Sequence, residues 1–262
     1  MAADIYTMGV DVGSTTSKCV VLKNGTEIAG SAIIPAGTGT SGPSRAVSAA
    51  LEDAGLQRSD ISCLTATGYG RNSFDGADYT VSELSCHAIG AHTLFPQART
   101  VIDIGGQDAK VLRIGENGKL DNFIMNDKCA AGTGRFLDVM ARVLELDIGQ
   151  MQECDAKAEK AVRISSACTV FAESEVISQL SNNVNINDLV AGIHDSVAVR
   201  TASLVRRLGM TAPVVMTGGV ARNGGVVRAL EQELGTKISV SPLSQLNGAY
   251  GAAIHAWEKT NH

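Results

Sequence analysis

The feature that most constrains this 262-residue chain is a segment that occurs twice. Residues 6–22 match residues 98–114 without a gap, at an offset of 92 positions. Three informative pairs keep that offset: Asp11 with Asp103, Gly13 with Gly105, and Lys18 with Lys110. Both copies then reach an Asn-Gly step, which favours a hairpin. The repeat therefore predicts two copies of one unit, each a strand, a tight glycine turn, a second strand and a hairpin.

The loops after the two aspartates have the composition of phosphate-binding turns. Each aspartate ends an apolar run, and small residues follow whose backbone amides can point toward an anion. Because two bare carboxylates would repel a phosphate, Asp11 and Asp103 predict a divalent cation such as Mg²⁺. The alternative is a pair of ordinary hairpins with polar turns. The shared Asp-x-Gly-x4-Lys pattern in matching apolar frames favours the phosphate site.

A third glycine turn follows the apolar run 213–217. Gly218 and Gly219 stand between this predicted strand and a predicted helix at 225–234. Glycine backbone at such a turn can pack flat against a base or ribose. Neither a P-loop nor a Rossmann glycine motif is present in the sequence. The three turns together indicate a nucleotide held mainly by backbone amides.

Composition narrows the class of protein. With 22 basic and 27 acidic side chains the net charge is −5, and no basic cluster suggests a nucleic-acid partner. Hydrophobic residues make up 44%, enough for a sizeable core in one large domain or two lobes. No apolar run is long enough for a bilayer, and Asp4 argues against a secretory signal. We expect a soluble, cytoplasmic protein that binds neither nucleic acid nor membrane.

Two of the six cysteines precede predicted amphipathic helices. Cys129 lies just before a helix expected at about 134–146, and Cys168 opens the next one. The N–H groups and partial positive charge of a helix start favour thiolates and anionic ligands, including an iron–sulfur cluster. Two cysteines are half of what a four-iron cluster needs, so a two-fold dimer would have to supply the rest. Taken alone, the local sequence favours the simpler interpretation, in which both cysteines are small residues near helix caps and bind no metal. Of the other four, Cys19, Cys63 and Cys86 are expected to be packed in the core, and Cys154 is expected to have no special role.

Seven motifs carry a resemblance to a known family. They lie at 11–18, 66–71, 82–87, 101–108, 125–136, 168–175 and 216–220. On these residues the chain resembles the activator components of 2-hydroxyacyl-CoA dehydratases over essentially its whole length. The glycine loops are shared with the wider superfamily of actin, sugar and acetate kinases and heat-shock chaperones, whereas the two cysteine motifs are specific.

The resemblance implies an α/β, actin-like fold with two duplicated lobes around a nucleotide cleft. We place the first lobe at 1–97 with 246–262 and the second at 98–245. The resemblance further implies a homodimer in which Cys129 and Cys168 of both subunits bind one oxygen-sensitive [4Fe-4S] cluster. The implied activity is ATP-driven transfer of one low-potential electron, from reduced ferredoxin or flavodoxin to a 2-hydroxyacyl-CoA dehydratase.

The site residues expected from these arguments fall into two groups. Asp11 and Asp103 organise Mg²⁺, and Gln107 or Asp108 positions the attacking water. ATP or ADP is expected to contact Gly13, Ser14, Thr15, Thr16, Ser17, Lys18, Gly105, Gly106, Gly132, Gly218, Gly219 and Gln245.

Three other functions remain open. The first is the ATPase subunit of a benzoyl-CoA reductase, which resembles this family. The second is a small-molecule kinase of the same superfamily, although 262 residues leave little room for a substrate lobe. The third is a chaperone-like ATP switch without a redox centre.

Overall fold

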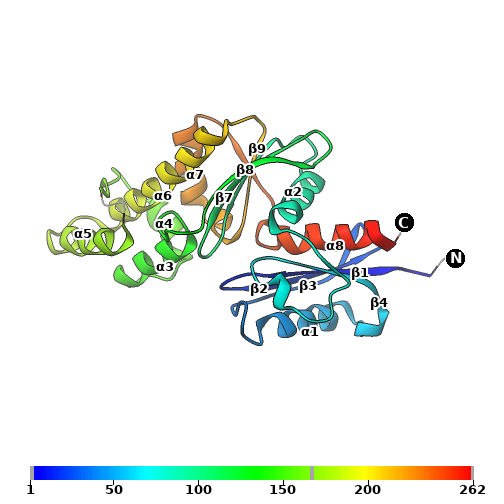
Figure 1. The fold of residues 1–262 in the computed structure, drawn as a ribbon. Helices are drawn as coiled ribbons and strands as arrows, with labels where there is room; N and C mark the ends of the chain where they lie inside the picture. Colours follow the sequence, from blue (N-terminus) through cyan, green and yellow to red (C-terminus); the bar gives the residue numbers. More distant parts are fainter. Residues whose placement is uncertain (1–2, 166–167, 261–262) are drawn as a thin grey trace. The chain divides into compact units, whose positions relative to one another are not determined.

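The chain folds into two compact units, shown in a computed structural model that describes residues 3–165 and 168–260 (Figure 1). Unit 1 spans Met1–Ala98, Ile114–Asp121 and Gln245–His262, and unit 2 spans Arg99–Arg113 and Asn122–Ser244. The boundaries expected from the sequence differ mainly at 114–121, a hairpin tip that packs with unit 1.

Unit 1 is built on a five-stranded sheet in the order β3-β2-β1-β4-β5. Its strands are β1 (Tyr6–Val12), β2 (Ser17–Lys23), β3 (Glu27–Ile34), β4 (Ile61–Thr67) and β5 (Tyr79–Thr80). Its helices are α1 (Gly42–Ala54), η1 (Arg58–Asp60), η2 (Arg71–Ser73), α2 (Glu83–Leu94) and α8 (Asn247–Thr260). The first three strands are antiparallel neighbours, and β4 joins β1 in parallel.

Helices cover both faces of this sheet. A Cβ at Gly30 of β3 would overlap the carbonyl oxygen of Ala50 in α1, so α1 lies against that face. A Cβ at Gly9 of β1 would overlap backbone of α8, which covers the other face. Successive residues of a strand point to opposite faces, and Met8 accordingly belongs to the core on the α1 side. The two glycines thus allow helix backbone to approach the sheet closely.

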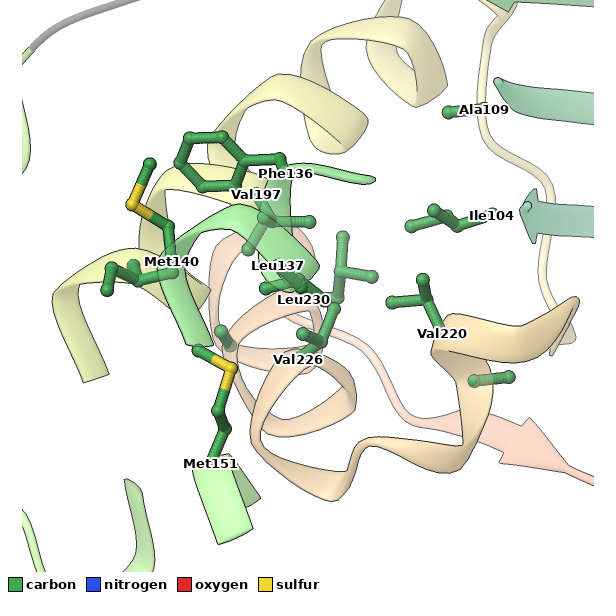
Figure 2. Close-up of a cluster of buried hydrophobic side chains, with 14 of the residues drawn as sticks. Ile104, Ala109, Phe136, Leu137, Met140, Met151, Val197, Val220, Val226 and Leu230 are labelled. Carbon is green, nitrogen blue, oxygen red and sulfur yellow. The ribbon is translucent and has the colours of Figure 1, made fainter. Parts of the chain in front are cut away.

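Unit 2 repeats the same sheet order with later strands, β10-β9-β6-β7-β8. Its strands are β6 (Thr100–Ile104), β7 (Ala109–Ile114), β8 (Leu120–Asn126), β9 (Val214–Thr217) and β10 (Ile238–Val240). Its helices are α3 (Gly134–Val143), α4 (Gln150–Ala156), α5 (Thr169–Ser181), α6 (Ile186–Leu208), η3 (Gly219–Arg222) and α7 (Gly224–Leu234), and η4 (Ser244–Leu246) lies at the junction of the two units. The helices α3, α6 and α7 and strand β6 share one apolar core, which contains Phe136, Val197, Leu230 and Ile104 (Figure 2).

The duplication predicted from the sequence is confirmed at the level of strand register. Asp11 pairs with Lys18 across β1 and β2, and Asp103 pairs with Lys110 across β6 and β7. The fold is α/β and actin-like, with the same sheet built twice. Within residues 3–165 and 168–260, none of the helices combines the length and apolar character needed to cross a bilayer.

Candidate nucleotide loops and cysteine segment

The two repeat loops are closed by equivalent backbone hydrogen bonds. In unit 1 the N–H of Gly13 donates to the carbonyl of Thr16 at 3.1 Å, and in unit 2 the N–H of Gly105 donates to the carbonyl of Asp108 at 2.9 Å. Among the described residues, the N–H groups at 14, 15, 106 and 107 have no hydrogen-bond partner. Each loop therefore presents two adjacent free amides, a feature typical of an anion site.

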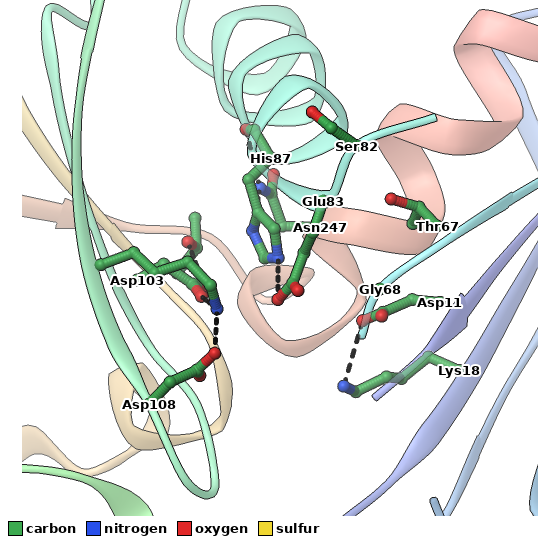
Figure 3. Close-up of polar contacts among 12 residues, drawn as sticks. Asp11, Lys18, Thr67, Gly68, Ser82, Glu83, His87, Asp103, Asp108 and Asn247 are labelled. Carbon is green, nitrogen blue, oxygen red and sulfur yellow. Dashed lines mark hydrogen bonds and ion pairs between the residues drawn. The ribbon is translucent and has the colours of Figure 1, made fainter. Parts of the chain in front are cut away.

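Asp11 is buried at the end of β1 with one oxygen engaged. Its Oδ2 accepts from Lys18 Nζ at 3.1 Å (Figure 3). Its Oδ1 is buried and has no hydrogen-bond partner among the described residues. A buried carboxylate oxygen without a donor is costly, and a hard cation or its water would satisfy it. Asp11 therefore fits the role of magnesium ligand expected from the sequence.

Asp103 has a different environment in unit 2. Its Oδ1 accepts from the Thr217 hydroxyl at 2.7 Å, and its Oδ2 lies 3.4 Å from Lys110 Nζ. Lys110 is only 2% exposed, and its ammonium also lies 2.8 Å from Asp108 Oδ2. Protein groups thus already contact both oxygens of Asp103, so this carboxylate fits a direct metal ligand less well than Asp11.

Lys110 and Thr217 are site residues to which the sequence argument assigned no role. Lys110 was visible as the partner of Lys18 in the repeat. Thr217 had a weaker signal, a Thr-Gly step that occurs at Thr67-Gly68 and again at Thr217-Gly218. The structure shows these steps to be equivalent, because Thr67 pairs with Asp11 and Thr217 with Asp103.

The glycines of these Thr-Gly steps both require left-handed backbone. Gly68 has φ +90° and Gly218 has φ +87°. A Cβ at Gly68 would overlap the Asp11 carboxylate, and a Cβ at Gly218 would overlap the carbonyl oxygen of Ile104. Only glycine accommodates both the torsion angle and the close approach.

The expected nucleoside turn lies between β9 and α7. Gly219 begins η3, and Asn223 caps α7 by accepting from the N–H groups of Gly225 and Val226 at 3.0 and 3.3 Å. The N–H of Gly218 donates to the carbonyl of Ser244 at 2.9 Å, and the next residue in the chain is the half-buried Gln245.

The two residues expected to position the attacking water differ in their surroundings. Gln107 is exposed at the tip of its loop, whereas Asp108 pairs with Lys110.

Cys129 lies in the loop between β8 and α3, and α3 begins at Gly134 as predicted. The N-cap of α3 is Thr133, not Cys129. Gly132, with φ +87°, and a turn in which Thr133 donates to the carbonyl of Ala130 separate the cysteine from the helix. The Asn126 side chain donates to the carbonyl of Cys129 at 2.9 Å and holds the loop. The thiol is exposed.

Cys168 is the N-cap residue of α5, as predicted. Among the described residues no side chain caps this helix start, and the Cys168 thiol is exposed. Before the cysteine, Ser165 donates from its N–H and its hydroxyl to Glu175 of α5, at 3.0 and 2.9 Å. The helix buries Ala172 and Val176 but exposes three large apolar side chains, Val170, Phe171 and Ile177.

The other cysteines are poor ligand candidates. Cys19, Cys63 and Cys86 are buried, and Cys154 is half-buried. Burial raises the pKa of the Cys86 thiol to about 12 and raises that of Cys19 as well, which disfavours the thiolate that binds metals. Among the six, only Cys129 and Cys168 are exposed.

Comparison with known proteins agrees with this duplicated architecture. The chain is 58% identical to the (R)-2-hydroxyglutaryl-CoA dehydratase activating ATPase of Acidaminococcus fermentans, over 97% of this chain and 98% of that protein. A solved structure, the activator of the 2-hydroxyisocaproyl-CoA dehydratase from Clostridium difficile with bound ADPNP, is 56% identical with a TM-score of 0.96, covering 98% of this chain and 96% of that one. A ROK family glucokinase from Streptomyces griseus shares the fold at 14% identity, with a TM-score of 0.60 and coverage of 97% and 99%.

A family model also matches residues 8–256, which include both repeat loops, both Thr-Gly steps and both exposed cysteines. The chain therefore belongs to the BadF/BadG/BcrA/BcrD ATPase family.

Proposed function

We propose that this ATPase activates a 2-hydroxyacyl-CoA dehydratase by delivering one low-potential electron to it. The electron comes from reduced ferredoxin or flavodoxin and passes through a [4Fe-4S] cluster. The observation that carries the proposal is the pair of exposed thiols, Cys129 and Cys168, in an ATPase that is 58% identical to a dehydratase activating ATPase. A kinase or a chaperone-like switch has no need of two exposed cysteines in one unit.

The donor set fits an iron–sulfur cluster shared by two copies of the chain. Thiolates are the ordinary ligands of a [4Fe-4S] cluster, which needs four of them. One chain offers two exposed thiols, and two chains offer four. The exposed apolar side chains of α5 begin two residues after Cys168, and a second copy would cover them. When bound, the cluster supplies one-electron redox chemistry.

The repeat loops and the Thr-Gly turn supply the ATP-binding residues. Backbone amides and side chains at 14–18 hold phosphate in unit 1, and the loop 105–107 holds phosphate in unit 2. Asp11 Oδ1 holds Mg²⁺ or its water, and Asp103 supports the second loop through Lys110. Gly132, Gly218 and Gly219 allow close approach of the nucleotide, and Gln245 reaches the base edge. Gln107 is favoured over Asp108 for positioning the water because Lys110 already holds Asp108.

Anaerobic purification followed by iron analysis tests the proposal. We expect a brown protein with about four irons per two chains, which activates a dehydratase only when ATP is present. Cys129→Ala and Cys168→Ala should lose the iron and the activation but retain ATP hydrolysis. Cys154→Ala, at a half-buried thiol of the same unit, is the matched control and should keep all three.

Two results would contradict the proposal. One is an iron-free protein that still hydrolyses ATP, which would favour a kinase or a switch. The other is a Cys129→Ala variant that keeps its full iron content.

A further inference from the structure

A short segment between β3 and α1 packs against the phosphate loop of unit 1. This support segment consists of Ala36, Gly37 and Thr38. Both the segment and the loop belong to unit 1. The support segment lies outside the repeated residues 6–22, so the repeat gave no reason to assign it a role.

Two hydrogen bonds join the support segment to the two ends of the loop. The N–H of Thr38 donates to the carbonyl of Gly13 at 2.9 Å. The hydroxyl of Ser17 donates to the carbonyl of Ala36 at 2.7 Å. The Ser17 residue is fully buried, so its hydroxyl serves to anchor the support segment.

Gly37 lies between these two bonds and packs against the next carbonyl of the loop. A Cβ at position 37 would overlap the carbonyl oxygen of Ser14, and it would lie 2.7 Å from the carbonyl oxygen of Gly13. The φ angle of Gly37 is not left-handed. The close approach to the loop, and not the torsion angle, therefore requires glycine at this position.

The directions of these carbonyls determine the directions of the two free amides of the loop. In a trans peptide unit the C=O of one residue and the N–H of the next point in opposite directions. The N–H of Ser14 therefore points away from Thr38, and the N–H of Thr15 points away from Gly37. These are the two N–H groups of the loop without a partner among the described residues. The support segment thus directs both amides to the side of the loop on which an anion can bind.

The support segment also contacts the turn that follows β4. A Cβ at Gly70 would overlap the Thr38 hydroxyl, which lies 3.4 Å from the hydroxyl of Ser73. The N–H of Gly70 donates to the carbonyl of Val12 at 2.8 Å. The three consecutive carbonyls at 12–14 are therefore each fixed by a neighbouring segment of unit 1.

The phosphate loop of unit 2 has its carbonyls held by a different element. The carbonyls of Gly105 and Gly106 accept from the N–H groups of Gly134 and Arg135, at 2.9 and 2.8 Å. Gly134 and Arg135 are the first two residues of α3. The two loops thus use unrelated segments to hold equivalent carbonyls, as expected if both loops must direct their amides at one ligand.

We propose that Gly37 and Thr38 are positioning residues of the ATP site. They direct the amides of Ser14 and Thr15 at oxygen atoms of the polyphosphate, which is the part of the ligand that the support segment serves. The inference rests on the nucleotide site of the proposed function, and it depends on neither the cluster nor a dehydratase.

Amide NMR spectra of the full-length, ¹⁵N-labelled protein test the inference directly. In the wild type, saturating ADPNP with Mg²⁺ should shift the amide protons of Ser14 and Thr15 downfield, together with those of Gly106 and Gln107. In Gly37→Ala, the added Cβ displaces the Ser14 carbonyl, so the shifts at 14 and 15 should be lost while those at 106 and 107 remain. The unit 2 amides are thus an internal control for binding and folding.

Calorimetric titration with ADPNP and Mg²⁺ measures the size of the effect. Gly37→Ala should weaken binding about tenfold, because hydrogen bonds to a charged phosphate are among the stronger ones. Ser17→Ala, a milder change that removes one bond to the support segment, should weaken binding about threefold.

Gly39→Ala is the matched control. A Cβ at position 39 meets open space, but φ is +76°, so the substitution strains the backbone without touching the loop. It should lower the melting temperature and bind ADPNP like the wild type. A general loss of stability is thereby separated from a loss of amide direction.

Two results would overturn the inference. One is a Gly37→Ala protein that keeps the wild-type affinity and the shifts at 14 and 15. The other is a Gly39→Ala protein that binds ADPNP as weakly as Gly37→Ala does. If Gly37→Ala does not fold, Ser17→Ala decides, and an unchanged affinity in that variant overturns the inference.

The wild-type spectrum distinguishes this inference from the proposed function. If ADPNP leaves the amides at 14, 15, 106 and 107 unchanged in the wild type, the assigned nucleotide site is refuted, and the inference fails with it. If the wild type responds and Gly37→Ala responds equally, the inference alone is refuted.

Discussion

Two aspartate–lysine pairs occupy equivalent places in the two units, yet their surroundings differ. Lys18 retains some exposure and, within the described part of the chain, pairs with Asp11 alone, whereas Lys110 is buried between Asp103 and Asp108. A buried charge with one partner removed is strongly destabilising. The duplicated sequence has thus diverged into one carboxylate that is open to a cation and one that is held by protein groups.

Lys110→Met tests how much the ion pairs of Lys110 with Asp103 and Asp108 contribute to the free energy of unfolding. The variant leaves two carboxylates near each other without their ammonium, so we expect the free energy of unfolding to fall by about 3 to 5 kcal/mol. Urea denaturation measures it. Lys128→Met, at an 88% exposed lysine of the same unit that pairs with Asp127, is the control and should change stability by less than about 1 kcal/mol. Equal effects at the two positions would contradict the burial of Lys110.

The stability contributed by Asp155 should depend on pH in a defined direction. Burial alone would raise the pKa of this carboxyl, but hydrogen bonds from His194 and Arg228 outweigh it and hold the pKa far below the ordinary value of 3.8. Because the folded-state pKa is depressed, the stabilisation is complete above the unfolded-state pKa and is lost as the pH falls below it.

Comparison of the wild type with Asp155→Asn at several pH values checks this. We expect the variant to be less stable by about 2 kcal/mol near neutral pH. The gap should stay constant down to about pH 5 and then shrink by up to about 1.4 kcal/mol per pH unit below 3.8. Asp138→Asn, at an exposed carboxyl of α3, serves as control. A gap that widens on acidification would show that Asp155 is not a stabilising carboxylate.

Helix α6 also holds the chain that leads toward Cys168. Asp188 in its first turn accepts from the N–H groups of Glu159 and Lys160 at 2.8 and 3.0 Å, and its carbonyl accepts from Val162 at 3.0 Å. Gly192 of α6 packs against this segment, and a Cβ at position 192 would overlap the carbonyl oxygen of Val162. The absence of a side chain at 192 therefore allows the segment to lie against α6.

Gly192→Ala should destabilise unit 2 despite the better helix propensity of alanine. Overpacking of this kind costs about 1 to 3 kcal/mol, which outweighs the gain of up to about 1 kcal/mol expected from propensity. Gly149→Ala is the matched control, because a Cβ there meets open space and φ is −68°. Thermal unfolding of the two variants decides the point. A Gly192→Ala protein as stable as the Gly149→Ala protein would contradict the close approach.

The elements were predictable to different degrees. The repeat predicted the strand pairs of both units because it kept its apolar positions and a glycine turn at one offset, and each copy was followed by an Asn-Gly step. The helix after Cys168 was also predicted correctly. The equivalence of Thr67-Gly68 and Thr217-Gly218 was missed, because their spacing of 150 residues differs from the 92-residue offset of the repeat. The start of α3 at Gly134 was predicted, but the left-handed Gly132 and the Thr133 turn that separate it from Cys129 were not.

The burial of the site's side chains could not be predicted from the sequence. Lys110 and Lys18 occupy the same position in the repeat, and only packing makes one of them nearly inaccessible. The orphaned Oδ1 of Asp11 and the hydrogen bonds of His194 with Asp155 and Asn223 likewise arise from tertiary contacts between segments far apart in the sequence. Local patterns contain no information of that kind.

The molecule as a whole contains two sheets with the same strand order, one in each unit. Both units present an aspartate, a free-amide loop and a left-handed glycine at equivalent positions. Unit 2 alone carries both exposed cysteines. The central claim is that nucleotide binding at these loops alters a metal centre held by Cys129 and Cys168.

The midpoint potential of the anaerobic, iron-loaded protein tests that claim most directly. It is measured by spectroscopic redox titration with ADP and again with ADPNP, each in the presence of Mg²⁺. The account predicts a more negative potential with ADPNP than with ADP, together with a changed spectrum of the reduced centre. An identical potential and spectrum in the two nucleotide states would contradict it.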